Sequence, residues 1–134
     1  MVGNPNIHFT NELQRRDFAH GRIDRRIVKI LRRFSRRHDI TITAARSDHD
    51  KYTSSGSVSN HWYGRAIDIG AVNGKVCTGS RRGACGKLAR RLAKLPPRIR
   101  PTELIYAFDA DGSGPNAFAD PAGHSDHVHV GFDE

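Results

Sequence analysis

The arginine-rich segment 22–37, RIDRRIVKILRRFSRR, constrains the fold of this chain more than any other feature. Its apolar residues recur at helical spacing and form one stripe, while arginines cover the remaining surface; the stripe consists of Ile23, Ile27, Ile30, Leu31 and Phe34. This periodicity predicts an amphipathic helix. Because such a stripe is normally buried, the helix needs a core supplied by the rest of the chain.

Four segments rich in β-branched and aromatic residues are predicted to be strands and to supply that core: residues 40–46, 65–72, 103–108 and 126–132. A second helix is predicted over 86–95, where two prolines follow. The order helix, strand, strand, helix, strand, strand predicts an α+β fold with a mainly antiparallel sheet and helices packed on one side. A chain of 134 residues fits a single domain, residues 1–134.

The chain is strongly basic, with 22 Lys and Arg against 14 Asp and Glu and a net charge of +8. The positive residues are concentrated in 22–38 and 81–94. Such a field attracts polyanions, and both nucleic acid and the anionic polymers of bacterial cell walls fit it. Each cluster alone is equally explained as a solvated helix face. No apolar run approaches the roughly 18 residues of a transmembrane helix, so no membrane span is expected.

Two cysteines, Cys77 and Cys85, bracket a short loop. In an oxidising compartment they are expected to form a disulfide. Their spacing is not CxxC, which makes them a poor zinc signal. No apolar region of a secretory signal is seen near the beginning of the sequence.

Strand alternation places three ionisable side chains on a polar sheet face. If 126–132 is extended, His127 and His129 project from one face and the valines from the other. In segment 65–70 the same rule sends Asp68 to the face of the small residues, opposite the isoleucines. Packing in an apolar core therefore does not account for these three side chains.

His61, Asp68 and one histidine of the DHVH segment meet the preference of zinc for nitrogen and carboxylate ligands. A surface histidine or a histidine with satisfied hydrogen bonds is the alternative interpretation of either motif alone. The other five histidines are predicted to be structural or exposed, with a place in the cleft left open for His49 and His124; they are His8, His20, His38, His49 and His124.

The segment SNHWYGRAID, residues 59–68, resembles the SxHxxGxAxD signature of the zinc D-Ala-D-Ala carboxypeptidases and related peptidoglycan peptidases, the LAS-type metallopeptidases. DHVH resembles their closing HxH motif. The resemblance covers about residues 40–132, and the helix of 22–37 occupies the place where relatives carry a helix. It implies a hedgehog-like or D-Ala-D-Ala-peptidase-like fold with one zinc per chain.

The resemblance assigns the metal site and the catalytic pair residue by residue. It implies that His61, Asp68 and His129 bind zinc. His127 then takes the place of the catalytic histidine, and Asp126 that of its acidic neighbour. Other branches of the family place an acidic general base at the position of Asp126, so the choice of proton carrier between Asp126 and His127 stays open.

The resemblance also assigns two residues to substrate. Arg46, in AARS, looks like the arginine of the family's GYRS segment, which contacts substrate or stabilises the oxyanion. Ser59, the first residue of the signature, is expected to bind substrate. Ala45 stands where the family carries an aromatic residue, so this wall of the site differs from the family's.

The implied activity is zinc-dependent hydrolysis of a peptidoglycan stem-peptide or cross-link amide next to D-alanine, by a monomer, with carboxypeptidase and endopeptidase both open. The implied location is extracellular, periplasmic or at the cell wall, reached by phage lysis or another export route. One alternative is a non-catalytic zinc-containing binding module of hedgehog-like fold, and the presence of both Asp126 and His127 favours the enzyme. A basic nucleic-acid-binding protein is the other alternative, and the lack of interleaved aromatics argues against it.

Overall fold

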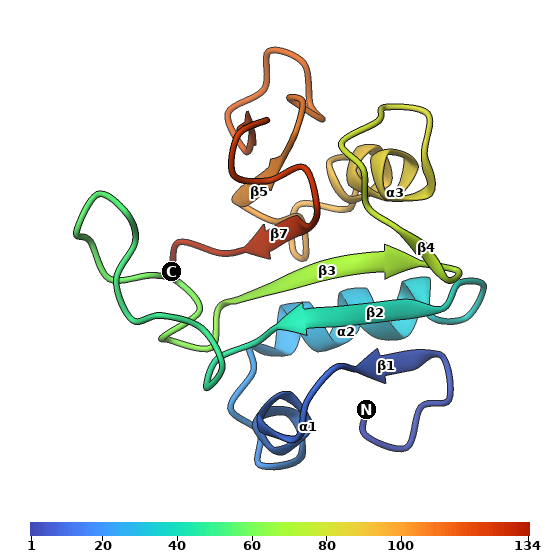
Figure 1. Ribbon diagram of the computed structural model, residues 1–134, viewed down its shortest axis with the longest axis vertical. Coiled ribbons are helices and arrows are strands. Elements are labelled where there is room, and N and C mark those ends of the chain that lie inside the picture. Colours follow the sequence, from blue (N-terminus) through green and yellow to red (C-terminus); the bar gives the residue numbers. More distant parts are fainter.

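The computed structural model describes residues 1–134 and contains three helices and one seven-stranded sheet (Figure 1). Along the chain the elements are β1 (Ile7–Phe9), α1 (Glu12–Ala19), α2 (Arg25–Phe34), β2 (Ile40–Ala44), β3 (Ala66–Val72), β4 (Lys75–Val76), α3 (Ala84–Leu92), β5 (Glu103–Tyr106), β6 (Ala117–Ala119) and β7 (Val128–Gly131). The strand order is β1-β2-β3-β7-β5-β6, and β4 pairs with β3.

The sheet is mixed, which corrects the prediction of a mainly antiparallel sheet. β1 pairs with β2 and β5 pairs with β6 in parallel, whereas the pairings of β3 with β2, β4 and β7, and of β7 with β5, are antiparallel. Both parallel pairs involve a strand of three residues, β1 or β6, at an edge of the sheet. Strands this short carry too little alternation to be predicted, so their direction was not predicted either.

The arginine-rich helix forms as expected but is shorter, and its beginning has a clear cause. Asp24 is the N-cap of α2, and its Oδ1 accepts a hydrogen bond from the backbone N–H of Arg26 at 2.8 Å. The apolar stripe is buried, with Ile27, Ile30 and Leu31 at most 1% exposed. Figure 1 shows α2 running across the far side of β2 and β3.

The central strands have one apolar and one polar face, as alternation predicts. Ile67, Ile69, Val128 and Val130 belong to a core cluster of 24 buried residues that also contains the buried residues of α2 and α3. Asp68 and His129 lie between these residues in sequence and therefore project from the opposite face. The sheet thus separates a helix-covered core from a polar surface.

The expected disulfide between Cys77 and Cys85 is confirmed, with a Cα–Cα distance of 5.3 Å. It joins the residue after β4 to the first turn of α3 and lies within the core. None of the three helices is long and apolar enough to cross a membrane. The likeness to the hedgehog and D-Ala-D-Ala peptidase folds stays a prediction.

Candidate metal centre

A tight turn before β3 positions His61. Gly64 has a φ of 72°, and a Cβ at this position would collide with the carbonyl oxygen of Arg22. The Gly64 carbonyl accepts a hydrogen bond from the backbone N–H of Asp24 at 2.8 Å, which ties the turn to the beginning of α2. Ser59 Oγ accepts a hydrogen bond from the His61 backbone N–H at 3.2 Å. The glycine of the motif is therefore required both by its conformation and by its close contact.

The register of the sheet brings the next two side chains to the same place. In the antiparallel pair of β3 and β7, Asp68 lies directly opposite His129. His61 Nε2 is 3.2 Å from Asp68 Oδ1, His129 Nδ1 is 3.3 Å from the same oxygen, and the two nitrogens are 3.3 Å apart. We call these three residues, His61, Asp68 and His129, the candidate metal centre. All three are buried.

The donor atoms of the candidate metal centre suit a zinc ion. Zinc binds nitrogen and oxygen at about 2.0–2.1 Å, so two ligands of a tetrahedral ion lie about 3.3 Å apart. His61 Nδ1 must donate its proton to the carbonyl oxygen of Ala45, 2.7 Å away, which leaves Nε2 free for a metal. Glu103 lies 2.6 Å from His129 Nε2, which leaves Nδ1 facing Asp68. The three predicted ligands are brought together, and their role in binding zinc stays a prediction.

His49 is the third member of a second metal-capable group, in which ligand atoms of His49, His61 and Asp68 all lie within 4.8 Å of one another. The rings of His49 and His61 are stacked, with centroids 3.8 Å apart and an interplanar angle of 7°. An imidazole lone pair lies in the ring plane, and two parallel planes share no point where one ion could bind both rings. His129, whose ring is inclined by 65° to that of His61, has no such conflict.

Burial and hydrogen bonding set the charges of the candidate metal centre. Burial alone would raise the pKa of Asp68, but its hydrogen bonds with His129 and His61 hold that pKa far below its usual value. Burial is also the main reason that the pKa of His61 is lowered. Burial opposes the charged form of His129 too, yet its bonds with Asp68 and Glu103 raise its pKa to about 9. Asp68 is therefore a carboxylate and His61 a neutral imidazole, the forms that bind metals, whereas His129 carries a proton that a bound metal must displace.

Glu103 was not among the predicted site residues. It begins β5 and holds His129 Nε2 at 2.6 Å, the arrangement by which carboxylates orient metal-binding histidines in proteins. Partial burial works to raise the pKa of Glu103, but the hydrogen bond with His129, the charge of His129 and the hydrogen bond with Asn60 together outweigh it and lower that pKa. The sequence places Glu103 and Ile105 on the face of β5 opposite the buried Leu104 and Tyr106, but only the pairing of Ile105 with His129 across β5 and β7 brings Glu103 to the centre.

Asp126 and His127 form a pair at the edge of the same cluster. His127 Nδ1 lies 2.6 Å from Asp126 Oδ1, and His127 Nε2 lies 3.8 Å from Asp68 Oδ2. The His127 side chain is 23% exposed and the Asp126 side chain 87% exposed. His127 therefore turns its free nitrogen toward the candidate metal centre, while Asp126 lies in solvent on the other side of the ring.

A hollow of about 430 Å³ opens above these residues. Its walls come from the loop before β3 and from the ends of β5 and β7, and they include both His49 and His124. These two histidines line the hollow, which is the alternative that the sequence analysis left open for them. His124 Nδ1 is fixed by Asp120 Oδ2 at 2.7 Å.

The two predicted substrate residues are placed differently. Ser59 is 4% exposed and lines the hollow. Arg46 does not line it: its Nε donates a hydrogen bond to the carbonyl oxygen of Trp62 at 3.0 Å, and its guanidinium carbon lies 5.4 Å from the centre of the Trp62 ring. A contact between Arg46 and substrate stays a prediction.

Comparisons with models of protein families, with curated proteins and with solved structures found no match.

Proposed function

We propose that this protein is a zinc-dependent peptidase that hydrolyses an amide of a peptidoglycan stem peptide or cross-link next to D-alanine. The observation that carries the proposal is the spacing of three ligand atoms, 3.2–3.3 Å apart, on His61, Asp68 and His129. The resemblance of residues 59–68 and of DHVH to peptidoglycan peptidase motifs supports the substrate class.

His61 Nε2, Asp68 Oδ1 and His129 Nδ1 would hold the ion, and all three residues line the hollow. Metal binding would release the extra proton of His129, and two neutral imidazoles with one carboxylate would then leave about one net positive charge on the ion. Bound zinc supplies a Lewis acid that polarises a carbonyl and lowers the pKa of water.

His127 is the proton carrier in this proposal, and Asp126 orients it. The Asp126 carboxylate accepts the Nδ1 proton of His127, so Nε2 carries the free lone pair on the side of the hollow. His127 Nε2 takes a proton from water as the new C–O bond forms. It then gives the proton to the amine nitrogen as the C–N bond breaks.

The walls of the hollow suit a peptide backbone. Only three of the sixteen lining residues are hydrophobic, and hydroxyl groups predominate in the loop before β3, at Thr53, Ser54, Ser57 and Ser59. These groups can bond to peptide N–H and C=O groups.

The test is digestion of purified sacculi by the zinc-loaded protein, with the released fragments identified by mass spectrometry. We expect fragments cut next to D-alanine, no release after treatment with a chelator, and recovery when zinc is restored. His127→Ala is the matched control, because it keeps all three proposed ligands. A protein that holds one zinc per chain and releases nothing would contradict the peptidase and support a non-catalytic zinc module.

A further inference from the structure

Two acid-free segments contain most of the positive charge of this chain. Residues 25–38 and 69–102 contain sixteen of the 22 Lys and Arg residues and no Asp or Glu. Of these sixteen, only Arg26 forms a salt bridge, with Asp24. The remaining fifteen positive side chains have no acidic partner within 4.0 Å. The fold thus leaves these charges available to an external anion.

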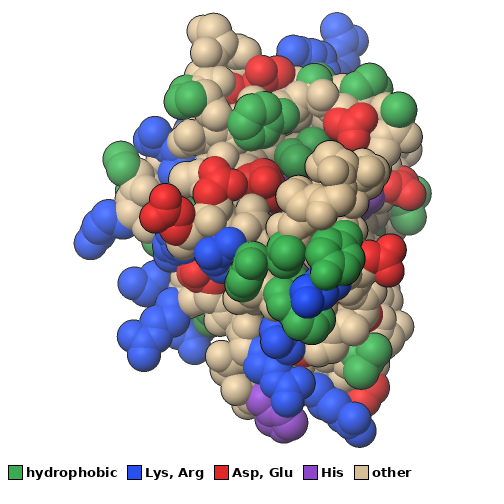
Figure 2. Space-filling model, turned by 90° about the vertical axis from the view of Figure 1, so that its left-hand side faces the viewer, with side chains coloured by type: hydrophobic (Ala, Val, Ile, Leu, Met, Phe, Trp, Pro, Cys, Tyr) green, Lys and Arg blue, Asp and Glu red, His purple; other side chains and the backbone are tan.

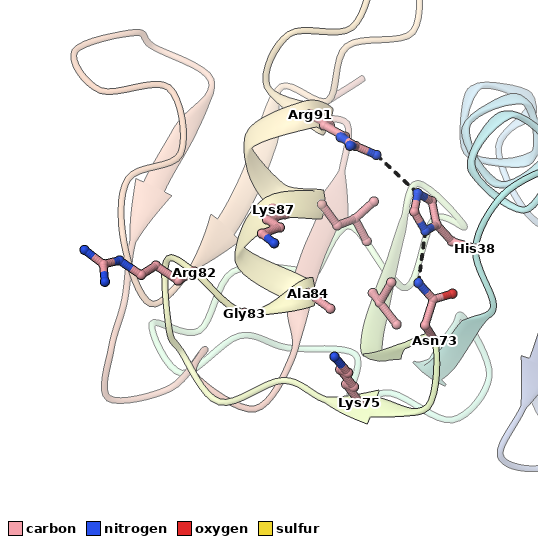
Figure 3. Close-up of a pocket in the computed structure, with 10 residues that line it drawn as sticks. His38, Asn73, Lys75, Arg82, Gly83, Ala84, Lys87 and Arg91 are labelled. Carbon is pink, nitrogen blue, oxygen red and sulfur yellow. Dashed lines mark hydrogen bonds between the residues drawn. The ribbon is translucent and has the colours of Figure 1, made fainter.

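The fold brings the two segments together at the C-terminal ends of α2 and α3. Arg91 Nη1 lies 3.2 Å from His38 Nε2, and Asn73 Nδ2 lies 3.1 Å from His38 Nδ1 (Figure 3). His38 therefore connects the end of α2 to α3 and to the turn between β3 and β4. In Figure 3, Lys75 and Lys87 lie along the same hollow.

The positive side chains line a series of connected hollows. The largest has a volume of about 550 Å³, and we call it and its lining side chains the cationic groove; the polar ones are Arg33, Arg36, Arg37, His38, Arg91 and Lys94. A neighbouring hollow of about 400 Å³ shares His38 and Arg91 with it. A third hollow, of about 470 Å³, shares Arg33 and Arg36 with the groove on the α2 side. The groove is therefore continuous from α2 to α3.

We infer that the cationic groove binds a linear phosphodiester polymer that carries no bases. Repeated phosphates match a continuous row of unpaired cations, and counterion release favours their binding. Proteins that bind single-stranded nucleic acid add aromatic side chains on which bases stack. Phe34, which is half-buried, is the one aromatic residue that lines these hollows, and the exposed aromatic residues line none of them; these are Tyr52, Trp62, Tyr63 and Phe118.

The groove and the candidate metal centre belong to different faces of the sheet. The groove is formed by the exposed sides of α2 and α3, which cover the apolar face, whereas Asp68 and His129 project from the opposite face. A polymer in the groove leaves the hollow over the metal centre open. The inference therefore does not rest on the proposed peptidase activity.

The test measures binding of poly(glycerol phosphate) to the whole protein across a range of salt concentrations. In one variant three exposed groove residues are replaced, Arg33→Ala, Arg37→Ala and Arg91→Ala. The matched control removes the same number of charges elsewhere, with Arg15→Ala, Arg16→Ala and Lys51→Ala. We expect the groove variant to bind at least about 10-fold more weakly. The magnitude of its slope of log affinity against log salt concentration should fall by about 2–3. The control should change affinity less than about 2-fold.

Two further measurements separate loss of charge from misfolding and identify the kind of polymer. Lysine replacements at the same three groove positions keep the charge and should restore most of the binding, which separates charge loss from misfolding. A single-stranded oligonucleotide with the same number of phosphates should bind more weakly than the polymer. Equal losses in the groove and control variants would overturn the groove, and tighter oligonucleotide binding that depends on the groove would overturn the choice of partner.

Discussion

The candidate metal centre and the cationic groove both gather ionisable side chains, but their charges are held in different ways. In the metal centre each group is buried and has fixed partners, with three ligand atoms 3.2–3.3 Å apart. In the groove the arginine and lysine side chains are exposed, and the contact of Arg91 with His38 is the only hydrogen bond between side chains that line it. Elsewhere on the surface, Figure 2 shows acidic and basic side chains interspersed.

The two regions should respond differently to the loss of one side chain. The buried groups of the metal centre are hydrogen-bond partners of one another, so the loss of one leaves the others unpaired in a poorly solvated place. Exposed charges act through their sum and are screened by salt. Single substitutions should therefore have large effects in the metal centre and small, additive effects in the groove.

The largest expected effect is loss of the metal. His61→Ala and Asp68→Ala should each abolish stoichiometric zinc, because two remaining ligands bind zinc far more weakly than three. Elemental analysis of the purified variants measures this, with circular dichroism to check the fold. Arg91→Ala, in the groove, is the control and should keep about one zinc per chain. Full occupancy in His61→Ala would show that zinc binds elsewhere.

The same measurement distinguishes the two metal-capable groups. His129→Ala should lose zinc, whereas His49→Ala should keep it, because the His49 ring is stacked parallel to that of His61. The opposite result would assign the third ligand to His49 and require its ring to turn.

The next largest effect concerns catalysis without loss of metal. His127→Ala should keep zinc and lose about 100-fold or more in turnover, the usual scale for general acid and base catalysis. Asp126→Asn should cost less, because the exposed Asp126 only orients the ring, and it should shift the pH profile. Zinc content and pH–rate curves of both variants decide the assignment, and a larger loss in Asp126→Asn would make Asp126 the base.

Glu103→Gln should have an intermediate effect on the metal centre. Its amide keeps the size of the side chain but removes the charge that holds His129 Nε2. We expect zinc affinity to fall about 10–100-fold, as for other residues that orient metal ligands. Competition with a chromogenic chelator measures the zinc affinity of both proteins. Unchanged affinity would show that the strand pairing alone orients His129.

A smaller effect is expected at Asp48, which supports the metal centre through the backbone. Its Oδ1 accepts from the Ala45 N–H at 2.7 Å, and its Oδ2 accepts from Asn11 and Gln14, both at 2.8 Å. Burial would raise the pKa of Asp48, but these hydrogen bonds outweigh it and lower that pKa. The stabilisation is therefore complete above the unfolded-state pKa of about 3.9 and is lost as pH falls through the folded-state pKa.

Asp48→Asn should lower the free energy of unfolding by about 1–2 kcal/mol at pH 7 and by less at pH 3. Urea unfolding in the presence of a chelator measures both values without a metal contribution. Asp50→Asn removes an exposed carboxylate that accepts no hydrogen bond and is the matched control. Equal losses at the two pH values would rule out the charge of Asp48 as the source of stability.

The sequence predicts the polar and apolar faces well because strand alternation is a local signal. It places Asp68 and His129 away from the core, and the structure pairs them directly across β3 and β7. It does not predict Glu103, because that side chain reaches His129 only through the pairing of β5 with β7. A contact set by strand register between distant segments leaves no local pattern.

Helix α1 was not predicted for a different physical reason. Its buried residues are Gln14, Asp17 and Phe18, so polar side chains occupy two of the three buried positions and no apolar stripe exists. Asp17 is buried because its Oδ2 accepts the backbone N–H groups of Arg46 and Ser47. A helix whose buried side chains are mostly polar has no hydrophobic periodicity, so the sequence pattern does not predict it.

The smallest expected effect is that of one charge in the groove. Arg36→Ala removes one exposed cation that has no acidic partner. It should weaken poly(glycerol phosphate) binding by only about 2–3-fold at physiological salt and lower the salt slope by about 1. Combining Arg36→Ala with Lys94→Ala should add the two losses, because well-solvated charges at an open groove act independently. Titrations of both single variants and the double variant test this. A single substitution that abolished binding would show a fixed anion site like the metal centre, and the contrast between the two regions would then fail.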